Sequence, residues 1–453
     1  MTADAATVRP AARLRGELRL PGDKSVSHRA LLLATLAAGA SRIAGAGDGA
    51  DIRSTAAIMG ALGATVAATR AADGRNVDYA VVSPGAGGLH APLATLDCGN
   101  SGTSLRLICG MLAGLPLTAT LDGDDSLRRR PVARIIEPLR RMGAVLHGRH
   151  DDSLPPLTVV GHTPLRAIDY TTPVPSAQVK SAILLAGLGA EGWTTVRERV
   201  ATRDHTERML RARGVPVAHA ASDGGGASWT MEGGLAVQAI DQHVPADVSA
   251  AAFWLVAGAI HPDAELTLRS VGVNPTRRAV IDILRAMGAD IVESALDESP
   301  LDERAAADPQ AGEPMADLVV RTSDLHSIDL GPADVAAAID EIPVLCLAAA
   351  RAHGTTTIRG AGELRHKESD RIAGIAAGLT ALGARVEVHG DDLRIHGDTT
   401  LRGALTDSLD DHRLAMTFAI AGLVASDDTT IERPASAAVS YPGFFADLEG
   451  VRA

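Results

Sequence analysis

One sequence pattern recurs six times along the chain and constrains its fold more than any other feature. Each copy has an apolar stretch rich in Leu and Ala, a short glycine-containing or polar turn, and then alternating residues that end in a polar loop. Because the copies fill the chain, they leave no room for an unrelated domain. The apolar stretch is typical of a helix and the alternating stretch of a strand, which predicts an α/β fold. The copies occupy residues 31–44, 107–123, 184–198, 253–270, 347–361 and 419–434.

A second sequence pattern lies between copies of the first and predicts a helix that ends in glycine before a strand. It occurs at residues 59–66, 141–146, 285–292 and 381–388. Glycine directly after a helix and before a β-branched stretch is the usual C-terminal stop of that helix. Each repeat therefore combines strands with two helices, and six repeats predict two pseudo-symmetric lobes of three units each.

Proline and glycine clusters indicate where the chain crosses between these lobes. One lies at Pro21-Gly22 and the other at residues 240–246. We expect one lobe over residues 22–242 and a second lobe over residues 1–21 plus 243–453. The acidic stretch 293–314 is expected to be a mobile surface insertion.

Composition excludes several functional classes. The net charge is −12 and aromatic residues make up only 2 % of the chain, which argues against nucleic-acid binding by base stacking and phosphate contacts. No apolar run has the length of a membrane span, and we expect no targeting segment at the N-terminus. The three cysteines form no paired framework, so reduced thiols and a cytoplasmic location are expected.

Only three of the 43 Lys and Arg residues are lysines, namely Lys24, Lys180 and Lys367. Where Arg is the default cation, a retained Lys indicates a need for a compact ammonium group, although chance is the alternative. Lys24 lies at the start of a long apolar helix, with Ser25 and Arg29 on its first turns. Such a helix start favours a phosphate or carboxylate ligand.

Four other segments combine cations with small polar residues at expected helix starts. For residues 96–110 the alternative is an ordinary capping motif. Arg128–Arg130 are expected in the first turn of a helix that begins near Pro131, and the alternative for them is a solvated basic loop. Residues 362–375 and 408–422 each contain Asp, His and Arg, but no ligand set at metal-site spacing. The glycine-rich residues 45–49 lack the dinucleotide-binding pattern, so we interpret them as a turn whose Asp51 caps the next helix.

Together these helix starts predict a site for a ligand with several negative charges. Asp340 and Glu368 could perform proton transfer beside the cations. The alternative for Asp340 and its neighbour Glu341 is a strand-to-helix junction whose acids face water.

Eight motifs in this order resemble the enolpyruvyl transferase family, and within it the branch that acts on shikimate 3-phosphate. The resemblance spans essentially the whole chain. It implies six βαβαββ-type units in two lobes, with the active site in the cleft between them. It also implies that phosphoenolpyruvate and shikimate 3-phosphate give the enolpyruvyl ether and phosphate, with no metal and no organic cofactor. The motifs are PGDKSVSHRA, GNSGTSLR, RRP, PSAQVKSAILLAG, RDHTERML, IDEIP, HKESDR and DDHR.

The resemblance also implies the site residues, motif by motif. For shikimate 3-phosphate they are Lys24, Ser25, Arg29, Ser176, Ala177, Gln178, Asp340 and Lys367. For phosphoenolpyruvate they are Lys24, Asn100, Gly102, Arg130, Gln178, Arg371 and Arg413. Asp340 would accept the proton of the 5-hydroxyl group. Either Glu368 or Lys24 would protonate the methylene carbon, and the sequence leaves that choice open.

Some positions depart from the usual family pattern. Many members have Ser-Ser-Gln where this chain has Ser176-Ala177-Gln178, and we expect nearby Lys180 to replace the missing phosphate contact. Gly102 stands where alanine can crowd the inhibitor glyphosate in some members. Two rival functions remain at this point, namely enolpyruvyl transfer to UDP-N-acetylglucosamine and non-catalytic anion binding. We expect a monomer with small-molecule partners, bound neither to nucleic acid nor to a membrane.

Overall fold

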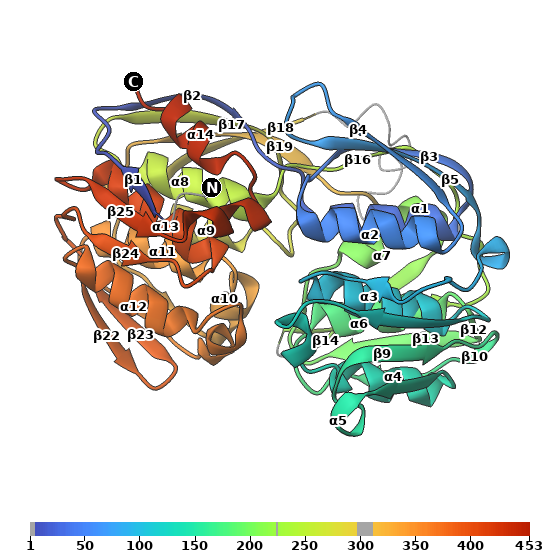
Figure 1. The fold of residues 1–453 in the computed structure, drawn as a ribbon. Helices are drawn as coiled ribbons and strands as arrows, with labels where there is room; N and C mark the ends of the chain where they lie inside the picture. Colours follow the sequence, from blue (N-terminus) through green and yellow to red (C-terminus); the bar gives the residue numbers. More distant parts are fainter. Residues whose placement is uncertain (1–4, 223–224, 297–310) are drawn as a thin grey trace. The chain divides into compact units, whose positions relative to one another are not determined.

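The computed structural model describes residues 5–222, 225–296 and 311–453. By its internal contacts the chain divides into two compact units (Figure 1). Unit 1 comprises Met1–Pro21, Pro245–Asp297 and Pro314–Ala453, and unit 2 comprises Gly22–Val244 with Glu298–Glu313. The expected boundary lies at residues 242 and 243. In the structure β16 (Gln242–His243) pairs with β3 (Ala38–Ala46) of unit 2, so the chain leaves unit 2 after Val244.

Unit 2 contains three four-stranded sheets with one common pairing pattern. In each, a short strand pairs parallel with a longer one, the longer strand pairs antiparallel with a third, and the third pairs antiparallel with a fourth. The first sheet has the order β16-β3-β5-β4, with β4 at Thr65–Arg70 and β5 at Val77–Pro84. The second has the order β6-β7-β9-β8, with bounds Leu96–Asp97, Thr118–Asp122, Leu154–Val160 and Val145–Gly148. The third has the order β11-β13-β15-β14, with bounds Asp169–Thr171, Trp193–Glu198, Gly226–Glu232 and Val217–Ser222. A short parallel pair, β10 (Leu165–Arg166) and β12 (Ala190–Glu191), lies apart from these sheets.

Unit 1 repeats the pattern, and its last sheet lacks one strand. The first sheet has the order β18-β19-β17-β2, with bounds Asp290–Ala295, Met315–Arg321, Ala264–Gly272 and Leu14–Arg19. The second has the order β20-β21-β23-β22, with bounds Asp329–Leu330, Thr355–Ile358, Asp392–His396 and Arg385–His389. The third has the order β1-β25-β24, with bounds Ala5–Val8, Thr429–Glu432 and Leu405–Asp407. The predicted α/β class is confirmed.

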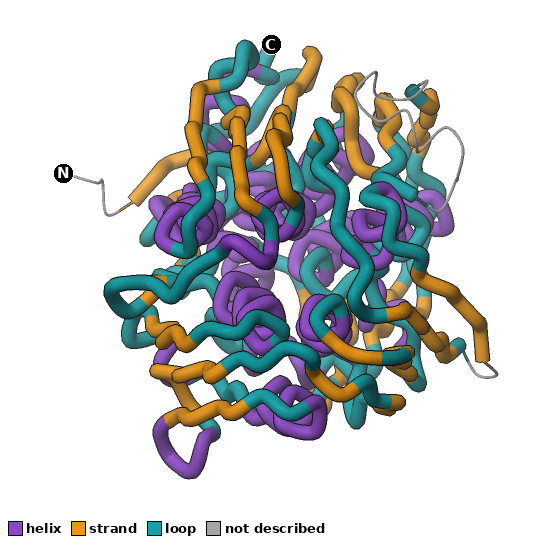
Figure 2. Tube along the Cα trace, turned by 90° about the vertical axis from the view of Figure 1, so that its right-hand side faces the viewer, coloured by secondary structure: helices purple, strands orange, loops and turns teal. Residues whose placement is uncertain are grey.

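Each of the six copies of the recurring sequence pattern begins in an apolar helix that is almost entirely buried. In unit 2 these helices are α1 (Lys24–Leu36), α3 (Gly102–Ala113) and α6 (Ala177–Gly187). In unit 1 they are α8 (Val248–Ile260), α11 (Ile342–Arg351) and α13 (His412–Val424). Within each unit these helices pack against one another, and Figure 2 shows helices inside the layer of strands. Because they are buried on nearly every side, they form the centre of the core.

Five of the repeats have a second helix, and four of these five helices bury only one face, whereas α7 (His205–Ala212) is buried along nearly its whole length. These helices are α2 (Ala50–Ala61), α4 (Ala133–Met142), α7 (His205–Ala212), α9 (Ala279–Ala286) and α12 (Arg371–Ala381). Shorter helices complete the fold: α5 (Arg149–Asp152), α10 (Pro332–Ala337) and α14 (Phe444–Gly450), with the 3-10 turns η1 (Ala86–Gly88), η2 (Leu127–Arg129), η3 (Gly362–His366) and η4 (Pro434–Val439). The glycine stops have positive φ, 108° at Gly143 and 100° at Gly288, as the predicted helix ends require.

Two local predictions are corrected by the structure. Arg128 and Arg129 lie in η2, and α4 begins only at Ala133, because the residues before it adopt a separate 3-10 turn. The acidic stretch 293–314 is in part ordered structure. Residues 293–295 belong to β18, and the Ala311 and Glu313 side chains are buried, while residues 297–310 lie outside the described residues.

The two units have separate aliphatic cores, one in each. The three cysteines, Cys98, Cys109 and Cys346, are unpaired and buried in them. Burial raises the pKa of each thiol, so they behave as small apolar side chains. Within the described ranges, no helix has the length and apolar character needed to cross a bilayer.

Two helix glycines make a matched test of this packing. A Cβ at Gly378 of α12 would lie 2.1 Å from Cζ of Phe418 in α13, whereas a Cβ at Gly60 of α2 would meet nothing within 4 Å. We expect Gly378→Ala to lower the free energy of unfolding by about 1–3 kcal/mol through overpacking. Gly60→Ala should raise it by about 0.5–1 kcal/mol through helix propensity. Urea unfolding followed by circular dichroism measures both, and equal effects of the two variants would contradict close packing of α12 on α13.

Candidate active site

Lys24, at the start of α1, forms an ion pair with a carboxylate of α2. Asp23 caps α1 by accepting a hydrogen bond from the Val26 amide at 2.9 Å. Lys24 is the first helical residue, and its ammonium group pairs with the buried carboxylate of Asp51. The prediction that Asp51 caps α2 is wrong, because Gly49 occupies the N-cap position and Asp51 lies in the first turn. Asp51 instead fixes the ammonium group of Lys24.

Arg29, one turn further along α1, is buried among neutral hydrogen-bond acceptors. Its Nε donates to Thr206 Oγ1 at 2.7 Å, and its Nη2 donates to Ser181 Oγ at 2.8 Å. Its Nη1 donates to the Ser25 carbonyl at 3.0 Å. Burial lowers the pKa of Arg29, but a guanidinium remains protonated at neutral pH. Since these three acceptors are two hydroxyls and a carbonyl, its positive charge can serve an anionic ligand.

Two guanidinium groups lie near Gly102 at the start of α3. A Cβ at Gly102 would be 2.7 Å from Arg106 Nη1 and 3.5 Å from Arg130 Nη1. Arg106 Nη1 donates to Gln178 Oε1 at 2.9 Å, and Gln178 Nε2 donates to Thr103 Oγ1 at 3.0 Å. The glycine thus gives both guanidinium groups room beside the first turn of α3.

Asn100 holds the second of these arginines. Arg130 donates from Nη2 to Asn100 Oδ1 at 2.6 Å and from Nη1 to the Asn100 carbonyl at 3.2 Å. The Asn100 amide in turn donates to Asp124 Oδ2 at 2.7 Å. Asn100 therefore orients Arg130, and its expected place at the phosphoenolpyruvate site stays a prediction.

The start of α6 carries Ser176, Ala177 and Gln178, but Lys180 does not join them. Ser176 caps the helix by accepting from the Val179 amide. The Lys180 ammonium group is wholly buried, with Glu198 Oε2 at 2.8 Å and Glu207 Oε1 at 3.0 Å. The expectation that Lys180 replaces a missing phosphate contact is therefore wrong, because two carboxylates already neutralise it inside the protein.

In unit 1 the acidic candidate Asp340 faces two cations. Its Oδ1 lies 3.6 Å from Lys367 Nζ and 3.7 Å from Arg371 Nη1. The next residue, Glu341, is buried in an ion pair with Arg277 at 3.1 Å and accepts from Ser249. The alternative of a junction whose acids face water is wrong for Glu341, and the turn joins two helices, α10 and α11, rather than a strand and a helix.

Arg371, the first residue of α12, is held by two carboxylates. Its Nε donates to Asp411 Oδ2 at 2.8 Å and its Nη2 donates to Glu368 Oε2 at 2.7 Å. Its buried Nη1 makes no hydrogen bond within the described chain, and the same is true of the buried Nε of Arg413 at the start of α13. Buried donors without acceptors are costly, so each of these two nitrogens is suited to an oxygen acceptor.

The charges of this cluster determine its protonation. Burial opposes ionisation of Glu368, but neighbouring Arg371 lowers the pKa of that carboxyl to about 2. Burial, together with Arg413, lowers the pKa of His412 to about 3. At neutral pH, Glu368 is therefore a carboxylate and His412 is uncharged.

The sequence-predicted residues thus form two groups. In unit 2 the starts of α1, α3 and α6 carry Lys24, Ser25, Arg29, Asn100, Gly102, Arg130, Ser176, Ala177 and Gln178. In unit 1 the α11, α12 and α13 starts and the preceding loops carry Asp340, Lys367, Glu368, Arg371 and Arg413. Sequence reasoning missed Ser181 and Thr206, the two hydroxyls that hold Arg29, although both lie inside the motifs PSAQVKSAILLAG and RDHTERML. No group of three or more metal-ligating side chains occurs among the described residues.

Comparison with known proteins gives one consistent result. The family model described as EPSP synthase (3-phosphoshikimate 1-carboxyvinyltransferase) matches residues 8–448. A 3-phosphoshikimate 1-carboxyvinyltransferase from Gloeobacter violaceus is 51 % identical over 447 residues, which cover 98 % of each chain. One from Halorhodospira halophila is 48 % identical and covers 96 % of this chain and 94 % of its own.

Solved structures agree with these relatives. EPSP synthase from Acinetobacter baumannii superposes with a TM-score of 0.85 at 38 % identity, covering 99 % of this chain and 98 % of that one. The enolpyruvyl transferase NikO from Streptomyces tendae has the same fold, with a TM-score of 0.75 at 19 % identity over 98 % of this chain and 96 % of that one.

The buried neutral imidazole of His412 predicts a pH dependence of stability. In the unfolded chain His412 takes up a proton near pH 6.5, whereas in the folded protein it stays neutral down to about pH 3. The free energy of unfolding therefore falls as pH drops below 6.5, by up to about 1.4 kcal/mol per pH unit from this group. We expect His412→Asn to lose less stability than the wild type between pH 7 and pH 5. Urea unfolding at the two pH values measures the difference, and parallel losses would contradict a buried neutral His412.

Proposed function

The chain belongs to the EPSP synthase family, and we infer that it transfers the enolpyruvyl group of phosphoenolpyruvate to the 5-hydroxyl of shikimate 3-phosphate, with release of phosphate. This is the reaction of a 3-phosphoshikimate 1-carboxyvinyltransferase, a transferase of the shikimate pathway. The observation that carries the inference is the family match over residues 8–448. Cations at several helix starts suit a reaction whose two substrates carry two phosphates and a carboxylate.

Shikimate 3-phosphate is the substrate we assign to Arg29 and its neighbours. Arg29 makes hydrogen bonds only to neutral acceptors among those given above, so its charge is available to a phosphate. Lys24, Ser25 and the start of α6 (Ser176, Ala177 and Gln178) contribute further donors. We also assign Asp340 and Lys367 to this substrate, with Asp340 on its hydroxyl groups.

Phosphoenolpyruvate is the substrate we assign to the remaining arginines. Arg130 lies beside Gly102, and Gln178 is close enough to this group to bind both substrates. Arg371 and Arg413 each keep one buried nitrogen without a hydrogen-bond acceptor. Lys24 completes the set, and Asn100 acts by holding Arg130.

The chemistry we propose is addition followed by elimination. Asp340 accepts the proton of the 5-hydroxyl as that oxygen bonds to C2 of phosphoenolpyruvate, while a proton adds to the methylene carbon. The resulting tetrahedral intermediate then loses a methyl proton and phosphate, which restores the double bond. Fixed cations stabilise the negative charge of the departing phosphate.

Glu368 and Lys24 remain the two candidates for the proton on carbon. Glu368 is a carboxylate while Arg371 neutralises it, so in this state it carries no proton to donate. Lys24 is an ammonium group paired with Asp51. Binding of phosphoenolpyruvate to Arg371 would weaken its pairing with Glu368 and so raise the pKa of that carboxyl.

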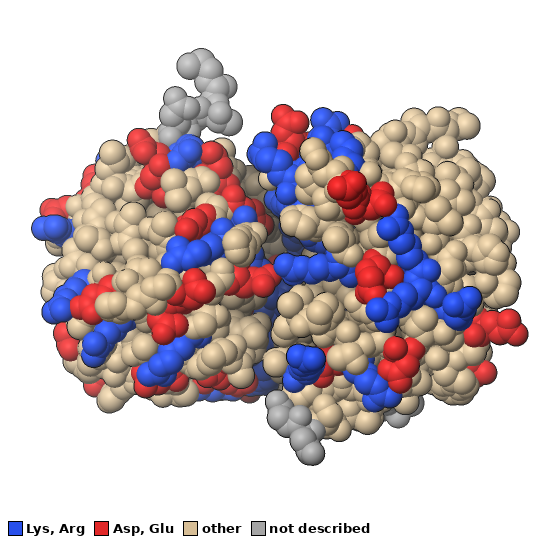
Figure 3. Space-filling model, turned by 90° about the horizontal axis from the view of Figure 1, so that it is seen from below, with Lys and Arg blue, Asp and Glu red and all other residues tan. Residues whose placement is uncertain are grey.

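The wider setting follows from the same proposal. The proposed reaction needs no metal and no organic cofactor. We propose a cytoplasmic location, which the three unpaired, buried cysteines support, and a monomeric state. Figure 3 shows Lys and Arg interspersed with Asp and Glu on the face drawn there, without the single-sign field typical of a polyanion-binding surface.

The first experiment measures phosphate release from phosphoenolpyruvate in the presence of EDTA. We expect release with shikimate 3-phosphate as acceptor and none with UDP-N-acetylglucosamine. Release only with the nucleotide sugar would reassign the acceptor. A folded sample that releases phosphate with neither would overturn the proposed function.

Replacing Asp340 tests its role as the base. Asp340→Asn keeps the size of the side chain but cannot accept the hydroxyl proton, so we expect kcat to fall by about 10²–10⁴-fold. The Kd of shikimate 3-phosphate should change much less, as measured by calorimetry on the same variant. A large loss of affinity with unchanged kcat would reverse this assignment.

Gly102→Ala tests the space beside the two guanidinium groups. The added methyl would press on Arg106 Nη1 at 2.7 Å and approach Arg130 Nη1 at 3.5 Å. Because long side chains can shift, we expect KM for phosphoenolpyruvate to rise about 3- to 30-fold, or roughly 1–2 kcal/mol. KM for shikimate 3-phosphate should stay within twofold, and an equal rise in both would contradict a local effect on the phosphoenolpyruvate ligands.

A further inference from the structure

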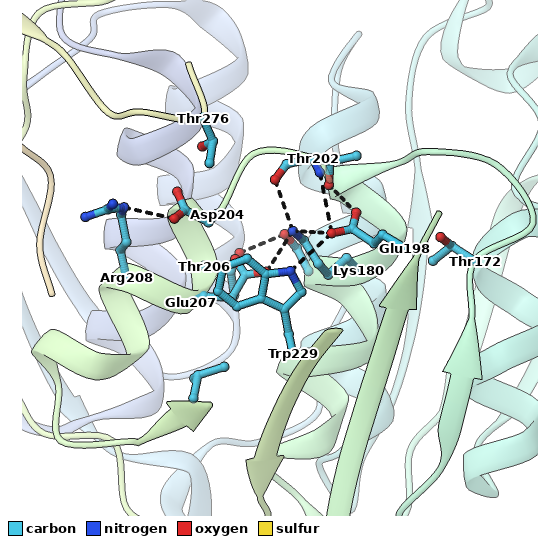
Figure 4. Close-up of polar contacts among 12 residues, drawn as sticks. Thr172, Lys180, Glu198, Thr202, Asp204, Thr206, Glu207, Arg208, Trp229 and Thr276 are labelled. Carbon is cyan, nitrogen blue, oxygen red and sulfur yellow. Dashed lines mark hydrogen bonds and ion pairs between the residues drawn. The ribbon is translucent and has the colours of Figure 1, made fainter. Parts of the chain in front are cut away.

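Lys180 lies at the centre of a buried cluster that the proposed chemistry does not use (Figure 4). Its ammonium group contacts Glu198 at 2.8 Å and Glu207 at 3.0 Å, and none of the three side chains is exposed. It also donates to the Thr202 carbonyl at 3.3 Å and lies 4.8 Å from the centre of the Trp229 ring. We call these five residues the Lys180 cluster.

Glu198 joins the cluster to the loop that leads into α7. Its Oε2 accepts from Trp229 Nε1 at 3.2 Å and from the Thr202 amide at 3.5 Å, and its Oε1 accepts the Thr202 hydroxyl. The cluster therefore connects α6, the end of β13, β15, the loop after β13 and α7. All these elements belong to unit 2.

Stability alone does not explain this arrangement. Burying two carboxylates and an ammonium group carries a large desolvation cost, and apolar side chains of the same volume are often at least as stabilising. Lys180 is also one of only three lysines in an arginine-rich chain. An ammonium group offers three donors around a single point, which suits acceptors on three sides, whereas a guanidinium is a planar fork.

The same two helices also hold Arg29. Ser181 follows Lys180 on α6, and Thr206 precedes Glu207 on α7. Arg29 donates to both hydroxyls, at 2.8 Å and 2.7 Å, and Thr206 donates to Ser181 at 2.7 Å. The contact that joins Lys180 to Glu207 is thus one residue away, on each helix, from the contacts that orient Arg29.

We propose that Lys180, Glu198 and Glu207 are positioning residues that fix α6 against α7 and so set the orientation of Arg29 toward shikimate 3-phosphate. This inference rests on the proposed function, because it takes Arg29 to be a ligand of that substrate. The cluster itself binds nothing, since its charged side chains are fully buried. It acts through Ser181 and Thr206, whose hydroxyls hold the guanidinium.

The test compares two variants of the cluster with one matched control. Glu207→Gln is the mild variant, because burial already raises the pKa of Glu207 and the amide keeps its shape. Lys180→Met removes the ammonium group and keeps most of the volume. Val159→Ala, at a buried position of β9 in the same unit, is the control for general loss of stability.

We expect both cluster variants to raise the Kd of shikimate 3-phosphate at least tenfold, with kcat at saturating substrate within threefold of the wild type. Calorimetry gives Kd, phosphate release gives kcat, and thermal unfolding shows that each variant is folded. Val159→Ala should leave Kd within twofold. If Lys180→Met does not fold, Glu207→Gln alone decides the outcome.

A double-variant cycle separates positioning from a merely structural role. In an Arg29→Gln background, Glu207→Gln should change Kd by less than twofold, because the group it positions is gone. Independent, additive losses would overturn the inference, and so would a Glu207→Gln variant that binds as well as Val159→Ala.

These outcomes are distinct from failure of the proposed function. A folded wild-type protein that neither binds shikimate 3-phosphate nor releases phosphate with it would overturn that function. Normal binding in Arg29→Gln would overturn the ligand assignment of Arg29 and this inference with it, while leaving the reaction in place.

Discussion

Burial of the six apolar helices is the constraint on which the rest of the structure depends. Each unit packs three such helices against one another, so their sides are unavailable to any ligand. Polar side chains that can meet a ligand are therefore confined to the first two turns of these helices and to the loops that lead into them. Those turns present free amide groups and the positive end of the helix dipole. The candidate residues accordingly gather at helix starts, as at Lys24, Gly102, Ala177, Arg371 and Arg413.

A second constraint is the cost of burying charge. Arg371 is only 1 % exposed and has Asp411, Glu368 and Asp340 around it, so its guanidinium is held in one orientation before any substrate arrives. A preorganised cation avoids reorganisation during the reaction, which is the main advantage of fixed charges in catalysis. Arg277 and Glu341 stabilise the turn that carries Asp340 in the same way, because each neutralises a partner that would be costly to bury alone.

Sequence reasoning predicted most of the fold because its signals are local. Each of the six copies of the recurring sequence pattern forms an apolar helix followed by a strand. The glycines predicted to end helices have positive φ, as at Gly143 and Gly288. The cap at Asp23 and the start of α1 at Lys24 follow from neighbouring residues alone. Errors arose where a partner distant in sequence decides the outcome. Asp51 was expected to cap its own helix, but it pairs with Lys24, and Lys180 was expected at a phosphate but is enclosed by Glu198 and Glu207.

The sequence by itself determined the repeat, the helix starts with their cations, and the identity of the family, since these depend on residue types at short spacing. Only the tertiary structure decided which charges stay available for a ligand and which are neutralised inside the protein. Lys24 and Lys180 are alike in sequence, as two lysines near helix starts, yet one remains partly exposed and the other is wholly buried. The difference arises because the packing of α6 on α7 brings two carboxylates to Lys180, and no local pattern encodes a contact between residues that far apart along the chain.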